Sequence, residues 1–381
     1  MTGAQLGFER RVQGALDAAP SRIPVVPGGC GTGRTWMLQR LRERLGRGAA
    51  QYIDVERCAT TPERFLQAVT SSSPFPFHAN HTPATAREAF DTLLVFFDTA
   101  RAPGGEPCTF LLDEVLELRT FESFPGLRHV LRDLLQGLSG SPNRFVLTTR
   151  YVARAHRLLR DATSRFEVMH IPALAVADLL APAFNGYEQM PTDDRDELGR
   201  TVQALTDGRP VYVRAIRDAV TQMGSRGADP ISALTALLSV EGELNHWCRF
   251  CYELRLHRAR GYGALKAILD ILADHEPLTL TEISLRLHRT PGSTKDYLSW
   301  LEDVDLVTSR QKKYSFTDPL LRLWVRLHCR PVPPTEEEVA REVQHYALAR
   351  LPQPEPAPAL VYAGAEATPE ERKSWGIIEI D

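Results

Sequence analysis

A glycine-rich stretch near the N-terminus has the residue types that bind phosphate. The stretch VVPGGCGTGRTW, residues 25–36, follows an apolar run and precedes a helical pattern. Glycines let consecutive backbone N–H groups turn toward phosphate oxygens, and the dipole of the following helix favours the anion. The spacing Gly-x-x-x-x-Gly-Lys-[Ser/Thr] of nucleotide phosphate loops is met, except that Arg34 stands at the lysine position. The residues predicted to hold the phosphates are Gly28, Gly29, Cys30, Gly31, Thr32, Gly33, Arg34 and Thr35.

Two further apolar runs end in polar side chains that suit the same chemistry. TFLLDEV (109–115) ends close to two adjacent carboxylates, Asp113 and Glu114. In phosphoryl-transfer sites the two members of such a pair have different roles, one in metal binding and one in orienting water. Asp113 would hold Mg²⁺ together with the hydroxyl of Thr35, and Glu114 would polarise the attacking water. The alternative, a strand that runs into an acidic helix cap, is disfavoured by the phosphate loop upstream.

The run RFVLTTR (144–150) is the third of these elements. Its last residues, Thr148, Thr149 and Arg150, are candidates for contact with the γ-phosphate or the attacking water. We therefore count Asp113, Glu114 and Arg150 as the candidate catalytic residues of this half of the chain.

The arginine in the loop sets an expectation about rate. Lysine is a compact point charge, whereas arginine is a longer planar fork. Arg34 keeps the positive charge but is expected to crowd the γ-phosphate. This predicts weak ATP binding, slow or conditional hydrolysis, or a switch that holds ADP.

The elements that must position these residues alternate between strand-like and helix-like patterns, which indicates an α/β fold with a parallel sheet covered on both faces. The expected strands are Ile23–Val26, Tyr52–Val55, Phe110–Leu112, Phe145–Thr148 and Val168–Ile171. The expected helices between them are Trp36–Leu45, Pro62–Thr70, Ala84–Arg101 and Gly126–Leu138. We expect a P-loop nucleotide-binding domain over 1–175, a helical lid over 176–260, a winged helix over 261–330, and over 331–381 a helix, a Pro/Ala linker and a docking tail.

The predicted winged helix has helices at Gly263–His275, Leu280–His288 and Ser293–Val304, then a hairpin that turns near Arg310–Lys312. Its candidate DNA-contacting residues are Arg289, Lys295, Lys312 and Lys313. Acidic residues dilute this patch, and a DNA reader usually offers more Lys and Arg to phosphates. The alternative is a domain that closes on the nucleotide domain without touching DNA.

Composition limits the class of protein. The chain has 381 residues and a net charge of −3, so no global basic field indicates nucleic acid. Its cysteines are scattered, no secretory signal precedes them, and no apolar run is long enough to span a bilayer. We expect a soluble, cytoplasmic protein.

In this order, the elements resemble the AAA+ superfamily, and most closely its STAND branch and the archaeal-type ATPase family. GFERRVQGAL resembles the segment near the adenine, with Phe8, and DGRP resembles the Gly-x-Pro element, with Pro210 against the base. The resemblance makes Arg209 or Arg214 a second phosphate sensor and Arg165 an arginine finger that reaches a neighbour's nucleotide. It implies ATP or ADP with Mg²⁺, and a homo-oligomer.

Three features fall outside these motifs. HWCRFC (246–251) has the letters of a zinc site, but its helical pattern favours packing of Cys248 and Cys251. Cys30 is either a buried spacer or a redox-reactive thiol. The last residues hold Trp375, Ile377, Ile378 and Ile380, which we expect to dock on a partner or on the protein itself.

The sequence thus favours an ATP-binding switch that regulates a partner protein or a DNA transaction. One rival is a non-hydrolysing scaffold that recruits partners through its tail. The other is a DNA-binding regulator for which nucleotide is only an effector.

Overall fold

The computed structural model describes residues 3–77, 82–179, 192–223, 229–257, 259 and 261–351. The Pro/Ala linker and the predicted docking tail with Trp375, Ile377, Ile378 and Ile380 lie outside the described residues.

The N-terminal half is built on a parallel five-stranded sheet with the strand order β2-β3-β4-β1-β5. Its strands are β1 (Ile23–Pro27), β2 (Ala50–Asp54), β3 (Thr109–Asp113), β4 (Arg144–Thr149) and β5 (Phe166–Val168). Each overlaps a predicted strand, so the predicted α/β fold with a parallel sheet is confirmed. The order puts β1, which leads into the glycine-rich loop, beside β4, and places β3 next to β4.

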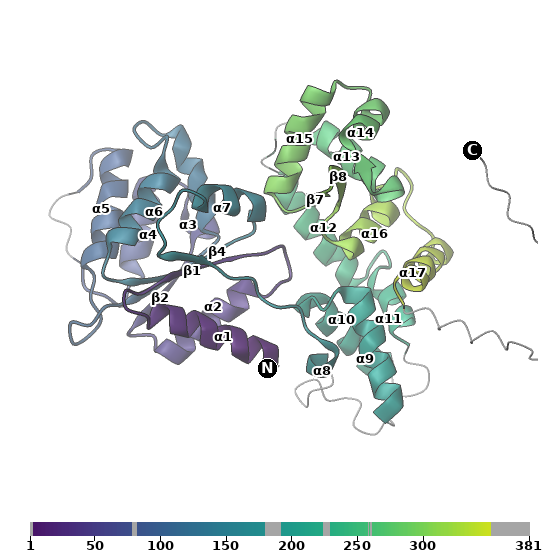
Figure 1. The fold of residues 1–381 in the computed structure, drawn as a ribbon, viewed down its shortest axis with the longest axis horizontal. Helices are drawn as coiled ribbons and strands as arrows, with labels where there is room; N and C mark the ends of the chain where they lie inside the picture. The colour runs from purple at the N-terminus through teal and green to yellow at the C-terminus, as the bar shows by residue number, and fades with distance from the viewer. Residues whose placement is uncertain are drawn as a thin grey trace, which may run out of the picture.

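Helices cover both faces of this sheet (Figure 1). The helical elements of this half are α1 (Gly3–Leu16), α2 (Arg34–Leu45), α3 (Val55–Cys58), α4 (Pro62–Ser71), α5 (Ala86–Thr99), the 3-10 helix η1 (Val115–Ser123), α6 (Val130–Gly140) and α7 (Val152–Leu159). In β3, Leu111 packs with α1 and α2, whereas Phe110 and Leu112 pack with α4, α5 and α6 on the other face. This alternation follows from the period of two in a strand. It also fixes which β3 side chains reach the end of the sheet next to the loop.

The C-terminal half begins with helices and then adds a small second sheet. Its elements are α8 (Val176–Leu179), α9 (Thr192–Thr206), α10 (Pro210–Met223), α11 (Pro230–Leu237), α12 (Glu243–Leu256), α13 (Tyr262–His275), β6 (Leu278–Thr279), α14 (Leu280–Leu287), α15 (Pro291–Asp303), β7 (Val307–Arg310), β8 (Lys313–Phe316), α16 (Pro319–His328) and α17 (Glu336–Arg350). The second sheet is antiparallel, in the order β6-β8-β7. The β7–β8 turn has positive φ at Gln311 (52°) and Lys312 (63°), the backbone of a tight two-residue hairpin.

Buried contacts tie the two halves of this C-terminal region together. Asp318 caps α16 by accepting hydrogen bonds from the backbone N–H groups of Leu320 and Leu321. Its other oxygen accepts from the hydroxyl of Tyr212 on α10 at 2.7 Å. Helices α10 and α16 are therefore held in a fixed relation, and α10 begins next to the glycine-rich loop.

Candidate functional site

The glycine-rich loop, called the phosphate loop below (residues 28–35), joins the end of β1 to the start of α2. Gly31 and Gly33 have φ values of 80° and 88°, in the left-handed region that favours glycine. The backbone N–H of Gly28 donates to the carbonyl of Thr149 on β4 at 3.1 Å, and the Thr32 hydroxyl donates to the carbonyl of Gly29 at 2.9 Å. The first of these bonds fixes the start of the loop to β4, and the second closes a turn inside the loop. The loop lies at the edge where the carboxyl ends of the parallel strands meet, which is where open α/β sheets bind ligands.

The structure brings Thr35 and Asp113 together, as the sequence predicted for a Mg²⁺ site. The Thr35 hydroxyl donates to Asp113 Oδ2 at 2.7 Å, across 78 positions of sequence. The same oxygen accepts from the Tyr52 hydroxyl at 2.9 Å, and Oδ1 accepts from the hydroxyl of Thr148. Asp113 is buried. Three hydroxyl donors from α2, β2 and β4 therefore hold its carboxylate at the first turn of α2.

Arg34 does not point freely into the loop, because it is engaged by the neighbouring carboxylate. Its guanidinium forms a buried ion pair with Glu114 and donates to the carbonyl of Gly29 at 2.7 Å. Glu114 also accepts from the backbone N–H of Arg150 at 2.8 Å. Burial raises the pKa of Glu114, but the charges of Arg34 and Arg150 outweigh this and lower that pKa below its ordinary value. In this arrangement Glu114 is a weak base.

Arg150, the predicted γ-phosphate reader, sits at the centre of an acidic cluster. Its guanidinium lies 2.5 Å from Glu56 Oε2 and 3.3 Å from Glu117 Oε1, and its Nε lies 3.4 Å from Glu114 Oε2. The Tyr151 hydroxyl donates to Glu117 at 2.6 Å. The sequence reasoning missed Glu56 and Glu117, although both follow strands of the sheet by a few residues.

A cavity of 350 Å³ opens beside the phosphate loop, and it contains both predicted base-contacting residues. Phe8 of α1 and Pro210 at the start of α10 both line it. The lining is Gln5, Phe8, Glu9, Thr32, Gly33, Trp36, Met37, Ile171, Leu174, Pro210, Val211, Arg214 and Arg217. Most of these side chains are apolar, and Thr32 and Gly33 belong to the loop itself. The volume and the lining suit a purine base next to its phosphates.

Three charged side chains from the C-terminal half converge on Gly29. A Cβ placed on Gly29 would lie only 2.6 Å from Asp305 Oδ2, so a side chain there would force the Asp305 carboxylate to move. The same point would be 3.3 Å from Arg255 Nη2 and 3.5 Å from Arg209 Nη1. Arg255 is 3% exposed, and its Nε has no hydrogen-bond partner among the described residues. A buried cation without a full set of partners, next to a phosphate loop, is a candidate phosphate ligand.

The sequence predicted Arg209 but neither Arg255 nor Asp305. Arg209 lies 3.1 Å from Asp318 Oδ2 and donates to the carbonyl of Thr317 at 3.0 Å, so part of its charge is already paired. Asp305 has a positive φ of 55° in the turn between α15 and β7. That turn carries no motif from which its contact with Gly29 could have been predicted.

The remaining predicted residues lie away from the loop. The guanidinium of Arg165 donates to the backbone carbonyls of Ser21, Ser139 and Ser141 at 2.6–3.0 Å. Its role as an arginine finger stays a prediction. Arg289, Lys295, Lys312 and Lys313 are all exposed, and Arg289 lies over the ring of Tyr297.

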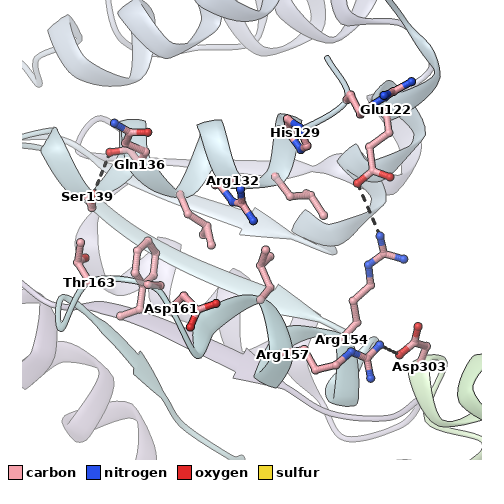
Figure 2. A pocket seen from close by; sticks show the side chains of 16 residues that line it. Glu122, His129, Arg132, Gln136, Ser139, Arg154, Arg157, Asp161, Thr163 and Asp303 are labelled. Carbon is pink, nitrogen blue, oxygen red and sulfur yellow. Dashed lines mark hydrogen bonds and ion pairs between the residues drawn. The ribbon is translucent and has the colours of Figure 1, made fainter. Parts of the chain in front are cut away.

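A larger hollow of 640 Å³ lies between α6 and α7 and does not include the phosphate loop (Figure 2). Arg154 of α7 lies 3.6 Å from Glu122, and Arg157 pairs with Asp303 at the end of α15. Figure 2 shows this second pair bridging from the α/β half to α15. Asp305, in the turn after α15, also contacts the α/β half, at Gly29.

Comparison with known proteins supports the fold described above, through one solved structure. No protein-family profile matches the chain, and no curated protein matches it either. The Walker-type ATPase of Pyrococcus abyssi superposes with a TM-score of 0.59 at 17% identity, over 84% of this chain and 95% of that one. The Aeropyrum pernix ORC1 protein in complex with DNA superposes with a TM-score of 0.42 at 15% identity, over 92% and 94%. The first likeness shows that the chain shares the fold of a Walker-type ATPase over most of both lengths.

The described part of the chain lacks both a membrane-spanning helix and a cluster of metal-binding side chains. None of its helices is long and apolar enough to cross a membrane. Within it, no group of three or more His, Cys, Asp or Glu side chains could hold a metal ion. A Thr–Asp pair completed by phosphate and water oxygens is a different kind of site, and it is the kind Mg²⁺ prefers.

The contact of Asp305 with the loop predicts a pH-dependent stability. Burial raises the pKa of Asp305 to about 6, against the charges of Arg255, Arg209 and Arg34. An unfolded aspartate titrates near 3.9, so the free energy of unfolding should fall as pH rises from about 4 through about 6. Asp305→Asn cannot ionise, so it should raise the free energy of unfolding at pH 8 by about 3 kcal/mol and leave it nearly unchanged at pH 4. Urea unfolding at the two pH values measures this, and an equal gain at both would contradict it.

Proposed function

We propose that this chain binds an adenine nucleotide with Mg²⁺ and acts as a nucleotide-controlled switch. The observation that carries the proposal is the 350 Å³ cavity, where Phe8 and Pro210 face a space that opens on Thr32 and Gly33 of the phosphate loop. The base would lie between α1 and α10, and the phosphates would lie along the N-terminus of α2. A backbone that requires positive φ at two loop glycines, followed directly by a helix N-terminus, supports the phosphate position.

The residues around the loop fit Mg²⁺. Thr35 and Asp113 already place two oxygen donors 2.7 Å apart at the first turn of α2. When bound, Mg²⁺ would neutralise phosphate charge and supply Lewis-acid chemistry at the γ-phosphate. Tyr52 and Thr148 would keep the Asp113 carboxylate in place through their hydroxyl groups.

Slow or conditional hydrolysis follows from the Arg34–Glu114 ion pair. Glu114 must accept a proton from water to act as a general base, and in this structure Arg34 and Arg150 hold it in its ionised, weakly basic form. A γ-phosphate offers Arg34 a competing partner. When Arg34 turns to the phosphate, Glu114 loses one of its two cations and its basicity rises. Nucleotide binding would therefore prepare the base, which makes hydrolysis depend on where Arg34 points.

The first test is the dependence of binding on Mg²⁺. Thr35→Ala removes the hydroxyl that joins α2 to Asp113, so ATP affinity in the presence of Mg²⁺ should fall about tenfold, toward the value measured in chelator. Titration of a fluorescent ATP analogue, with and without Mg²⁺, measures this. Thr308→Ala on β7 is the matched control and should bind as the wild type does. Unchanged Mg²⁺ dependence in Thr35→Ala would remove Thr35 from the site.

We further propose the division into a nucleotide domain (1–175), a helical lid (176–260), a winged helix (261–330) and a tail (331–381). The order of α13, α14, α15 and the β7–β8 hairpin supports the winged helix. The contacts of Asp305 and Arg255 with Gly29 support a lid that closes on the nucleotide site, as in STAND-type switches. Homo-oligomerisation with Arg165 as the finger belongs to the same proposal.

DNA contact is the second candidate function, and the exposure of four basic residues on and near α15 favours it. Each phosphate contact adds close to one unit to the slope of log affinity against log salt concentration. Changing Arg289, Lys295 and Lys312 to alanine together should therefore reduce that slope by about 3 if these residues bind phosphate. Fluorescence anisotropy with a labelled duplex at several salt concentrations measures the slope. Absence of salt-dependent binding by the wild type would leave this region as a lid alone.

A further inference from the structure

Cys30, in the middle of the phosphate loop, faces α12. A Cβ placed on the glycine before Cys30 would lie 3.3 Å from Arg255 Nη2, and one placed on the glycine after it would lie 3.8 Å from Trp247 Nε1. Trp247 and Arg255 lie four residues before and four residues after Cys251 on the same helix, so all three share one face of α12. The loop residues on either side of Cys30 therefore lie near α12 residues on either side of Cys251. The geometry of the loop and the helix places the two cysteines opposite each other.

The side chains of Cys30 and Cys251 interact, and both thiols are free. Cys251 is 3% exposed, whereas Cys30 is partly exposed. The hydrogen bond from Cys251 lowers the pKa of Cys30 well below its ordinary value; burial opposes this, and the charges of Arg255, Arg34 and Arg150 add to it. The same hydrogen bond raises the pKa of Cys251. Cys30 is thus the nucleophilic thiol and Cys251 the neutral partner, which is the division found in reactive cysteine pairs.

We propose that Cys30 and Cys251 form a reversible disulfide that fastens α12 to the phosphate loop and blocks nucleotide binding, with a low-molecular-weight disulfide such as oxidised glutathione as the oxidant. This inference rests on the proposed function, since it concerns the regulation of the same nucleotide site. The proposed bond joins residues 30 and 251, which are 221 positions apart in the chain. It would therefore link the α/β half directly to the helical region.

The reaction proceeds by two thiol–disulfide exchanges and needs no other reactant. The thiolate of Cys30 attacks one sulfur of oxidised glutathione, forms a mixed disulfide and releases the first glutathione thiolate. Cys251 then gives up its proton and attacks the Cys30 sulfur, which releases the second glutathione thiolate. In sum, two protein thiols are oxidised to one disulfide, and one glutathione disulfide is reduced to two glutathione molecules. Excess reduced thiol reverses both steps.

The disulfide would act on nucleotide binding through the groups that already cover Gly29. Arg255 lies one turn after Cys251 on α12, and its Nη1 donates to the backbone carbonyl of Asp305 at 3.4 Å. Fixing Cys251 to the loop therefore fixes Arg255 and, through it, the Asp305 turn against Gly29. Phosphates could then enter only by displacing the Asp305 carboxylate from Gly29, while the disulfide keeps the Asp305 turn close to the loop.

The experiment uses the full chain, incubated with oxidised glutathione or with excess dithiothreitol. Peptide mapping under non-reducing conditions reports the disulfide, and titration with a fluorescent ATP analogue reports binding. The oxidised wild type should show the Cys30–Cys251 linked peptide and at least a tenfold loss of affinity, which dithiothreitol restores. Cys251→Ser should give no linked peptide and should hold Cys30 as its mixed disulfide with glutathione, because the second exchange then lacks its thiol. Cys58→Ser, a change at a partly buried cysteine outside the site, should respond as the wild type does.

The outcomes separate this inference from the proposed function. If the reduced wild type does not bind nucleotide, the proposed function is wrong, and the peptide map alone decides whether the cysteines pair. If it binds but only glutathionylated Cys30 is found, or no linked peptide is found, the pairing is wrong. If the linked peptide forms and affinity does not change, the disulfide exists but does not regulate the site, and the switch is overturned.

Discussion

Glu114→Gln is expected to lower ATP hydrolysis by about 10²–10⁴-fold and, at the same time, to strengthen ATP binding. Glutamine keeps the shape of the side chain but cannot accept the proton of the attacking water, so the general base is lost. It also removes the charge that holds Arg34, since the guanidinium now pairs with Glu114 and the Gly29 carbonyl. A freed Arg34 can turn fully to the phosphates. Single-turnover hydrolysis and equilibrium titration with ATP measure the two effects.

The opposite signs of these two effects make the prediction specific. Glu122→Gln, at an exposed carboxylate 3.6 Å from Arg154, is the matched control and should change neither quantity. Arg34→Lys should raise turnover, because lysine fits the phosphate loop and forms a weaker pair with Glu114. If Glu114→Gln weakens ATP binding, Arg34 does not alternate between Glu114 and phosphate. If neither wild type nor Arg34→Lys hydrolyses ATP, the scaffold alternative is favoured.

Asp305→Asn is expected to raise ATP affinity by about 30-fold at pH 8. The Asp305 carboxylate now lies against Gly29, within a group of arginines that phosphates would otherwise pair with. A hydrogen bond to a charged group contributes about 1.5–3 kcal/mol, and about 2 kcal/mol corresponds to a factor of about 30 in affinity. Asparagine removes the negative charge and leaves Arg255 and Arg209 to the phosphates.

The pKa of Asp305, raised to about 6, gives this prediction a second test. Below pH 6 the wild-type carboxyl is protonated and resembles asparagine, so the two proteins should bind ATP with similar affinity at pH 5. Their difference should grow as pH rises to 8. Isothermal titration at both pH values measures it, with Asp296→Asn, at an exposed position on α15, as the control. A 30-fold difference that persists at pH 5 would show that the charge of Asp305 is not its cause.

The parts of the site that could be predicted from sequence are those formed by local segments. The phosphate loop, the carboxylates at the end of β3 and the polar end of β4 each lie within a few consecutive residues. Parallel strands then bring them together at one edge. Phe8 and Pro210 came from the family resemblance, and both line the cavity beside the phosphate loop; their contact with a base stays a prediction.

The parts that could not be predicted depend on packing between distant elements. Arg255 and Asp305 have no local signal, because their contact with Gly29 depends on how α12 and the turn after α15 settle on the loop. The pairing of Arg34 with Glu114 was missed for a related reason. Sequence shows that an arginine replaces the lysine. Only the structure shows that its longer side chain reaches both the loop and Glu114, which lies just after β3 with β4 between that strand and β1.

Equilibrium binding of ATP to the purified chain tests the central claim most directly. Calorimetric titration in the presence of Mg²⁺, after removal of any copurified nucleotide, should give one site per chain and an affinity that falls when Mg²⁺ is chelated. Phe8→Ala should weaken that binding, because it opens one wall of the cavity beside Thr32 and Gly33. Absence of binding at millimolar ATP and Mg²⁺ would contradict the account, and it would leave the loop as a structural turn.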